Sequence, residues 1–176
     1  VFTGLALGLA FLSKYAALYF LILLIVWWII YDRGNSLSLK NLFLLVSTSF
    51  VISSSNLYWN YLNDFVTVSH TVSNADLKNI ILNNNNVIEF VSSQLLVFGP
   101  IIFLLYLFVV FESFFKNKKL SLLASLSFPI IFLITIQSFL KIANANWAVT
   151  AYIAATLILS AFVVIDKKKY LRFFFK

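Results

Sequence analysis

The sequence predicts an all-α, multi-pass transmembrane helical bundle. Of its 176 residues, 62% are hydrophobic and only 11% are charged, whereas a typical soluble chain is about half apolar and about a quarter charged. The apolar residues form unbroken runs without the inside/outside alternation of a membrane β-barrel, so each run must satisfy its backbone hydrogen bonds as a helix. An ordinary soluble domain is therefore excluded.

Five runs are long enough to cross the hydrocarbon layer, which needs roughly 20 apolar residues with about 17 as a lower limit. They are Tyr15 to Tyr31, Lys40 to Leu57, Phe90 to Phe111, Leu120 to Leu140 and Trp147 to Ile165. The first run, Val1 to Leu12, is too short to cross alone, and we expect either the end of a truncated span or a half-helix. Because the chain opens inside this run, residues 1–176 are expected to be a fragment of one integral-membrane domain.

The connections between these spans alternate in charge. Residues 32–40, 112–119 and 166–176 are net basic, whereas residues 58–89 are net acidic and residues 139–146 carry a single lysine. The positive-inside rule places the basic connections in the cytoplasm. We therefore expect 58–89 to be an outer, periplasmic loop with a surface helix and 166–176 to be a basic cytoplasmic tail. The net charge of +7 is then a topology signal, and no nucleic-acid partner is expected.

Lys14 stands alone in the stretch from Val1 to Tyr31, which is otherwise free of charge. A bare ammonium at that depth would cost several kcal/mol. We expect a chain break that lets the lysine reach an interface, an anionic partner, or both. The charge alternation places this lysine at or just below the outer interface.

The outer segment from Asn56 to Ala75 begins with an aromatic belt, and polar residues then recur at helical spacing from Asn60 to Thr71. This pattern is typical of a helix on the membrane surface. A structural helix and one that lines a substrate cavity are equally compatible with it. The asparagine tract 83–86 predicts a turn or flexible loop, and Pro129 predicts a kink within its span.

Few residues of this sequence suit chemistry at a site. His70 is the only histidine and cysteine is absent, so there is no zinc-type ligand pattern and no metal or other cofactor is expected. A lone exposed histidine is more often a surface residue than a general base. Gln94 fits interhelical hydrogen bonding and substrate contact equally well. Lys14 and Lys141, both on the predicted outer face, are suited to binding a lipid-linked phosphate where water is scarce.

Four ordered pieces of the sequence carry a family resemblance. They are GLALGLAFLSKYAALYF at Gly4 to Phe20, NLYWNYLNDFVTVSHT at Asn56 to Thr71, QLLVFGP at Gln94 to Pro100 and NANWAVTAY at Asn144 to Tyr152. Together they resemble bacterial members of the dolichyl-phosphate-mannose protein mannosyltransferase-like group. These are the RgtA/B/C/D-like glycosyltransferases of the GT-C superfamily, which are related to the aminoarabinose transferase that modifies lipid A.

The resemblance implies a GT-C-like enzyme of the bacterial inner membrane. Such an enzyme takes a sugar from a polyprenyl-phosphate donor and transfers it to a lipid, glycan or protein acceptor on the outer side, among membrane lipids and without a cofactor. Lys14 is similar to the family lysine that contacts the donor phosphate, and Lys141 is expected to assist it. The other candidates are expected to line the cavity, namely Tyr15, Trp59, Asn60, Asp64, His70, Gln94, Asn146 and Trp147.

The chain departs from the family pattern in two places. Family members commonly carry a proline just before the WN pair, where this chain has Ser55 or Asn56. The acidic catalytic base belongs to an early outer loop, which we expect upstream of Val1, so this fragment alone is expected to be inactive. Asp64 is the substitute within the chain. The alternatives are a transporter or lipid flippase, whose broken helices and isolated lysines would line a path, and a structural membrane subunit.

Overall fold

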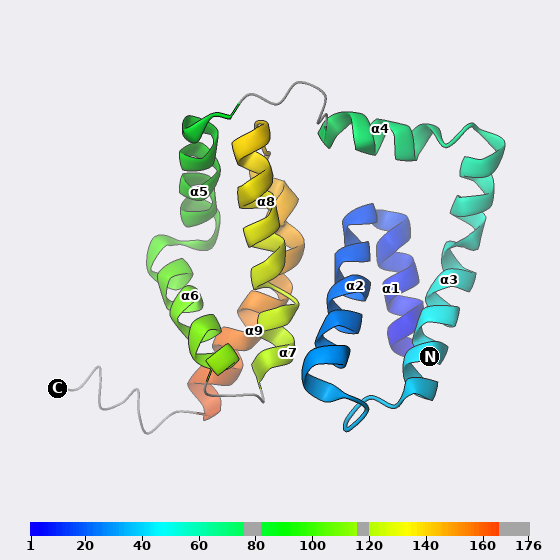
Figure 1. Cartoon of the computed structure of the whole chain (residues 1–176), viewed down its shortest axis with the longest axis horizontal. Coiled ribbons are helices and arrows are strands. Elements are labelled where there is room, and N and C mark those ends of the chain that lie inside the picture. The colour runs from blue at the N-terminus through cyan, green and yellow to red at the C-terminus, as the bar shows by residue number, and fades with distance from the viewer. Residues whose placement is uncertain (76–81, 116–119, 166–176) are drawn as a thin grey trace. The chain divides into compact units, whose positions relative to one another are not determined.

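The computed structural model describes residues 1–75, 82–115 and 120–165, and within these ranges the chain forms helices and connecting turns without any strand (Figure 1). The predicted all-α fold is confirmed. The chain divides into two compact units, Val1–Leu82 and Asn83–Lys176, and each is described by itself. The predicted tail at 166–176 lies outside the described residues.

The described part of the first unit contains two short helices, then one long helix and then a third short helix. The short helix α1 (Phe2–Ser13) leads through a 3-10 turn (Tyr15–Ala17) into α2 (Leu18–Trp27), which ends in a π-helical turn (Trp28–Asp32) and is followed by α3 (Leu39–Leu62) and α4 (Val66–Ala75). The stretches Tyr15–Asp32 and Leu39–Leu62 are long and apolar enough to cross a membrane. Both predicted spans of this unit are thus confirmed by length and composition.

Two glycines bring α1 against α3. A Cβ added at Gly4 would lie 2.5 Å from the carbonyl oxygen of Leu45, and one added at Gly8 would lie 2.6 Å from Cβ of Ile52. From Gly4 to Gly8, the nearest contact on α3 moves from Leu45 to Ile52. Thr48 also touches Gly4 and Ser49 touches Gly8, so the contacts move toward the C-terminal end of both helices, which therefore run in the same direction. Glycines four residues apart allow such close approach of membrane helices.

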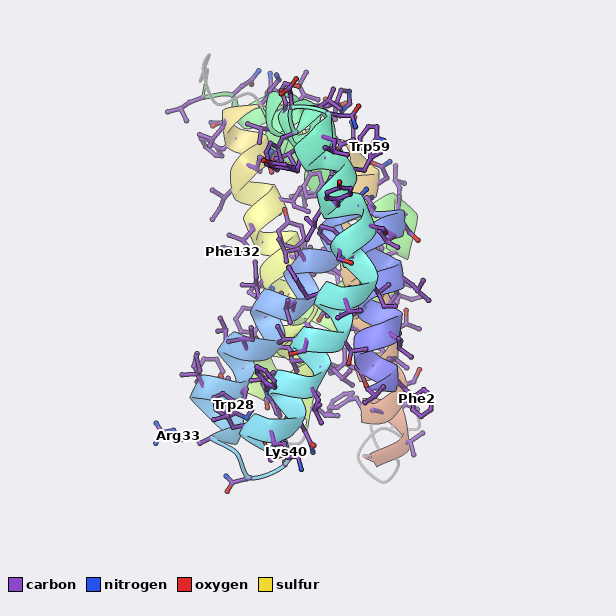
Figure 2. The ribbon with its side chains drawn as sticks, turned by 90° about the vertical axis from the view of Figure 1, so that its right-hand side faces the viewer. Phe2, Trp28, Arg33, Lys40, Trp59 and Phe132 are labelled. Atoms are coloured by element: carbon purple, nitrogen blue, oxygen red, sulfur yellow. The ribbon has the colours of Figure 1, made fainter. Side chains whose placement is uncertain are left out.

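The end of the first unit that carries Arg33 also carries a tight turn. Arg33 and Gly34 adopt positive φ angles, and the Asp32 carboxylate accepts hydrogen bonds from the backbone N–H groups of Ser36 (2.8 Å) and Leu37 (2.9 Å). Figure 2 shows Trp28, Arg33 and Lys40 at this end of α2 and α3, whereas Trp59 lies toward the opposite end of α3. The positive charge of this unit therefore lies mainly away from the α3–α4 connection.

The polar residues from Asn60 to Thr71 do not belong to one helix, so the prediction of a single continuous helix is wrong at residues 63–65. Helix α3 continues to Leu62, and the chain then turns a corner in which Asp64 (φ 51°) and Phe65 (φ 53°) are left-handed. Asn63 stops the helix because its side chain donates to the carbonyl of Trp59 (2.8 Å), the local hydrogen bonding by which asparagine competes with helix. The helix that follows this corner is the shorter α4, and its place on the membrane surface stays a prediction.

The second unit contains the remaining helices. They are α5 (Asn84–Phe98), α6 (Pro100–Phe115), α7 (Ser121–Ser125), α8 (Phe128–Leu140), a 3-10 turn (Ala145–Ala148) and α9 (Val149–Ile165). Two stretches, Ser121–Leu140 and Ala145–Val164, are long and apolar enough to span a membrane. The core of this unit is formed by fully buried side chains such as Tyr106, Phe90, Ile130 and Ile158.

The predicted span from Phe90 to Phe111 is not one straight helix. It breaks between α5 and α6, which are bent by 101°, because Gly99 takes a positive φ of 86° and Pro100 has no N–H to continue the helix. The N–H of Asn83 donates to the carbonyl of Phe139 at the end of α8 (3.1 Å), whereas α6 packs on α7 and α9 (Figure 1). The two arms follow opposite halves of the unit, which favours one broken span over a re-entrant loop.

One smaller prediction for this unit is wrong, whereas the interruption predicted near Pro129 is present within the span Ser121–Leu140. The asparagine tract is not a loop, because Asn83 caps α5 by accepting from the N–H of Asn85 (2.9 Å) and the next residues form the first helical turn. Asparagine is a favoured N-cap. Pro129 stands in the first turn of α8, and the helical run is interrupted just before it, at Leu126 and Ser127. Pro129 has no N–H to donate to the carbonyl of Ser125, the last residue of α7, which explains the position of the break.

Candidate functional site

Lys14 lies at a break between α1 and α2, as one of the two explanations for its isolated charge predicted. Its N–H still donates to the carbonyl of Ala10 (2.8 Å), but its backbone is extended (φ −156°, ψ 124°), and its own carbonyl accepts from Ala17 (3.0 Å) to start the next turn. The side chain is exposed. The ammonium therefore extends from a gap between two apolar helices rather than from the side of a continuous one.

The next residue, Tyr15, ties this break to α3 and α4. Its hydroxyl group donates to Oδ1 of Asn56 (2.9 Å), accepts from Nδ2 of Asn60 (3.1 Å) and contacts Oγ1 of Thr67 (2.7 Å). Thr67 in turn donates to Oδ1 of Asn60. Asn60 is almost fully buried, with 1% of its surface exposed. We call Tyr15, Asn56, Asn60 and Thr67 the Tyr15 network.

The other candidates of the first unit surround this network on α3, the corner and α4. Trp59, next to Asn60, is 47% exposed. Asp64 is exposed in the left-handed corner, and His70 is exposed on α4, three residues after Thr67. Thus the exposed indole, carboxylate and imidazole groups belong to segments held by the same network, while the amide of Asn60 is inside it.

In the second unit, Gln94 is fully buried and bridges α5 to the start of α9. Its amide nitrogen donates to Oγ of Ser93 (3.0 Å) and to the carbonyl of Ala145 (3.3 Å), and its oxygen accepts from the hydroxyl of Tyr152. The ring of Tyr152 stacks on Phe98, with centroids 4.6 Å apart. Gln94 therefore makes interhelical hydrogen bonds, one of the two roles that the sequence left open.

Lys141 occupies a position like that of Lys14. It caps the C-terminal end of α8 in an extended conformation (φ −159°, ψ 156°), its N–H donates to the carbonyl of Gln137 (3.0 Å), and a 3-10 turn precedes the next long helix. That turn carries Asn146, which is exposed, and Trp147, which is half-buried. Since Lys14 and Lys141 belong to different units, their joint action on one phosphate stays a prediction.

The described parts of the chain offer cations and neutral polar groups rather than a metal site. Within residues 1–75, 82–115 and 120–165, no cluster of three or more His, Asp or Glu side chains is arranged to hold a metal ion. Hydroxyl and amide groups of the Tyr15 network satisfy one another, so they keep the break in shape without adding charge. The chemistry available at this end of the first unit is that of the exposed ammonium of Lys14 and of a carboxylate and an imidazole on segments that the Tyr15 network holds.

The sequence is 35% identical over 162 residues to the lipid A galacturonosyltransferase RgtD of Rhizobium johnstonii (strain DSM 114642 / LMG 32736 / 3841). This alignment covers 88% of the chain and 33% of that relative. The chain is similar to part of one RgtA/B/C/D-like glycosyltransferase. Thus the predicted resemblance is confirmed, for a chain that spans a third of the length of RgtD. No family model matches the chain, and no solved structure matches it.

The structure joins some of the predicted site residues directly. It brings Tyr15 and Asn60 into hydrogen-bond contact, and it connects Gln94 to the turn that holds Asn146. Three contact residues were not among the candidates, namely Asn56, Thr67 and Tyr152. Asn56 and Tyr152 lie inside the pieces NLYWN and NANWAVTAY that carry the resemblance, and Thr67 follows Asn60 by seven residues. Only the fold shows that these residues meet partners distant in sequence.

Proposed function

We propose that this chain is the donor-binding part of a membrane glycosyltransferase. The whole protein would take a sugar from a polyprenyl-phosphate donor and transfer it to an acceptor on the outer side of a bacterial inner membrane. The proposal rests on the relationship to RgtD, a lipid A galacturonosyltransferase, combined with one observation: Lys14 lies at a fixed break in an apolar stretch without other charges.

The donor phosphate is the proposed partner of Lys14. When the bond between the sugar and the phosphate breaks, the leaving lipid phosphate gains negative charge, and a preorganised cation lowers the barrier more where water is scarce than in bulk water. Lys14 is exposed at the gap between α1 and α2, so a lipid-held phosphate can approach it. Lys141, at the similar gap after α8, is proposed as a second phosphate contact.

The acceptor hydroxyl must lose a proton during the transfer, which requires a general base. We propose that this base comes from a part of the full-length enzyme that precedes the chain. Asp64 is the substitute within the chain, because it is exposed at the corner between α3 and α4. Trp59, His70, Asn146 and Trp147 are proposed to line the path of the sugar and the acceptor.

The test uses the full-length protein in proteoliposomes with a radiolabelled polyprenyl-phosphate sugar. Replacement of Lys14 by alanine is expected to lower kcat/KM by about 100-fold, as loss of one preorganised transition-state contact typically does. Lys40→Ala is the matched control, because this lysine lies in the first turn of α3, next to the Arg33 turn. An unaltered rate in a normally inserted Lys14→Ala protein would show that Lys14 does not bind the leaving phosphate.

The proposed side of the membrane has its own test. A single cysteine in place of His70 is expected to react with an impermeant maleimide added outside intact cells, and one in place of Arg33 only after the cells are opened. The two positions lie on α4 and in the turn before α3. Labelling of position 70 from the cytoplasmic side alone would reverse the orientation and remove the periplasmic site.

The broken pair α5 and α6 keeps transport as a second candidate. Interrupted helices are typical of the substrate sites of secondary transporters, and these two arms are bent by 101°. The residues on either side of this break are Phe98 and Pro100 rather than charged ones, which favours a structural bend. Movement of a labelled polyprenyl phosphate across liposomes that contain the protein but no acceptor would support transport instead.

A further inference from the structure

The hydroxyl of Tyr15 is a junction between three helical segments. It lies directly after the Lys14 break and meets Asn56 and Asn60 near the end of α3 and Thr67 in the first turn of α4. The Tyr15 hydroxyl donates its single hydrogen to Asn56, the amide of Asn60 donates to Tyr15, Thr67 donates to Asn60, and the 2.7 Å contact between Tyr15 and Thr67 closes a ring of polar contacts. Connected hydrogen bonds of this kind reinforce one another in a low-dielectric setting.

The packing of α1 on α3 continues into this ring. Gly8 touches Ser49, and seven residues later Tyr15 reaches Asn56, which is seven residues after Ser49. The two chains thus keep the same register on either side of Lys14, although the backbone at Lys14 is extended. Lys14 is held between two fixed points on α3, and its Cα position depends on both.

Thr67 makes the position of α4 part of the same arrangement. The corner before α4 contains two left-handed residues, Asp64 and Phe65, and a bulky residue such as phenylalanine is strained there. The hydrogen bond that Thr67 donates to Asn60, together with its contact with the Tyr15 hydroxyl, holds α4 against this corner. His70 follows Thr67 by three residues on α4 and so lies on nearly the same face of that helix.

We infer that Tyr15, Asn60 and Thr67 are positioning residues for Lys14. Through them, the attachment of α4 sets where the ammonium meets the phosphate of a lipid-linked donor. This inference depends on the proposed function, because it assigns the network to the same phosphate site. None of the three residues needs to touch the donor. Their effect passes through Lys14, which distinguishes them from residues that only stabilise the fold.

The experiment measures binding of farnesyl phosphate to the full-length protein in nanodiscs by calorimetry. Tyr15→Phe removes the hydroxyl but keeps the ring, which stacks on Phe11 with centroids 4.9 Å apart. We expect this variant to raise Kd by about tenfold, since small displacements of a positioned group cost one to two orders of magnitude. Thr67→Val is expected to raise Kd less. Tyr19→Phe, on the following helix α2, is the control and is expected to bind like the wild type.

The decisive measurement combines substitutions. If Tyr15 acts through Lys14, then Tyr15→Phe weakens binding in the wild-type background but adds nothing in the Lys14→Ala background, a coupling that a double-mutant cycle detects. Equal weakening in both backgrounds, or wild-type Kd for both Tyr15→Phe and Thr67→Val, would overturn the positioning role. If Lys14→Ala itself leaves Kd unchanged, the proposed function fails rather than this inference alone. Thr67→Val keeps the test valid if Tyr15→Phe does not fold.

Discussion

Replacement of Gly4 by alanine is predicted to separate α1 from α3. The added methyl would lie 2.5 Å from the carbonyl oxygen of Leu45 and 2.8 Å from Cβ of Thr48, whereas an ordinary contact needs at least 3.4 Å. Because the nearest atom is backbone and cannot rotate away, α1 has to move outward by about 0.9 Å. Overpacking of this kind costs about 1–3 kcal/mol, and the better helix propensity of alanine returns up to about 1 kcal/mol.

The expected net loss in the free energy of unfolding is thus about 1–2 kcal/mol. It is measured by SDS titration of the purified full-length protein in mixed micelles, and Ala6→Val, which adds carbon at an exposed position of the same helix, serves as the control. Gly8→Ala should behave like Gly4→Ala, since its methyl would lie 2.6 Å from Cβ of Ile52. If Gly4→Ala is as stable as the wild type, the close packing of α1 on α3 does not exist.

Three further substitutions test other contacts. Tyr152→Phe removes the hydroxyl that donates to the buried Gln94 and is expected to lower stability by about 1–2 kcal/mol, whereas Tyr58→Phe on the exposed side of α3 should change nothing measurable in the same SDS titration. Gly99→Ala forces a side chain onto a φ of +86° and should cost about 1–3 kcal/mol; a stable variant would contradict the break between α5 and α6. Asp32→Asn leaves one acceptor oxygen where the carboxylate accepts two backbone hydrogen bonds, so a loss of about 1 kcal/mol is expected, and an unchanged midpoint would refute the role of that turn.

Composition and run length were enough to predict the helices that span the membrane. Apolar runs such as Tyr15 to Tyr31 have no alternative in lipid but helix, and the charge of Lys14 in such a run predicted a break that the structure contains. These features depend on local sequence and on the solvent. They could be predicted without knowledge of any contact.

The corner at Asp64 and the bend at Gly99 could not be predicted from periodicity alone. At the corner, the polar pattern continues at helical spacing through residues that are left-handed in the structure, because Asn63 satisfies the end of α3 locally. At the bend, Gly99 and Pro100 are residues that can interrupt a helix, but the unbroken apolar run around them suggested a single span. Composition indicates whether lipid or water surrounds a segment, but it does not determine the path of the backbone.

The candidate site likewise combines a feature that the sequence predicts with contacts that only the fold reveals. Lys14 was found because an isolated charge is costly in lipid, whereas the Tyr15 network depends on contacts between residues 41, 45 and 52 positions apart. Asn56 and Thr67 each look like ordinary polar residues of an interfacial segment. The parallel packing of α1 and α3 brings Asn56 to the Tyr15 hydroxyl, and the corner before α4 brings Thr67 to it.

Because α1 and α3 keep the same register, their contacts determine the position of Lys14 along the axis of α3. Each added residue in a helix moves everything beyond it by about 1.5 Å along the axis and about 100° around it. A single residue inserted between Ile52 and Asn56 would therefore leave the glycine contacts intact while it moves Asn56 and Asn60 out of reach of the Tyr15 hydroxyl. The seven residues from Gly8 to Tyr15 match the seven from Ser49 to Asn56, and this match sets the depth at which Lys14 can meet a charged headgroup. Homologues that lengthen one of the two helices should therefore lengthen the other by the same amount.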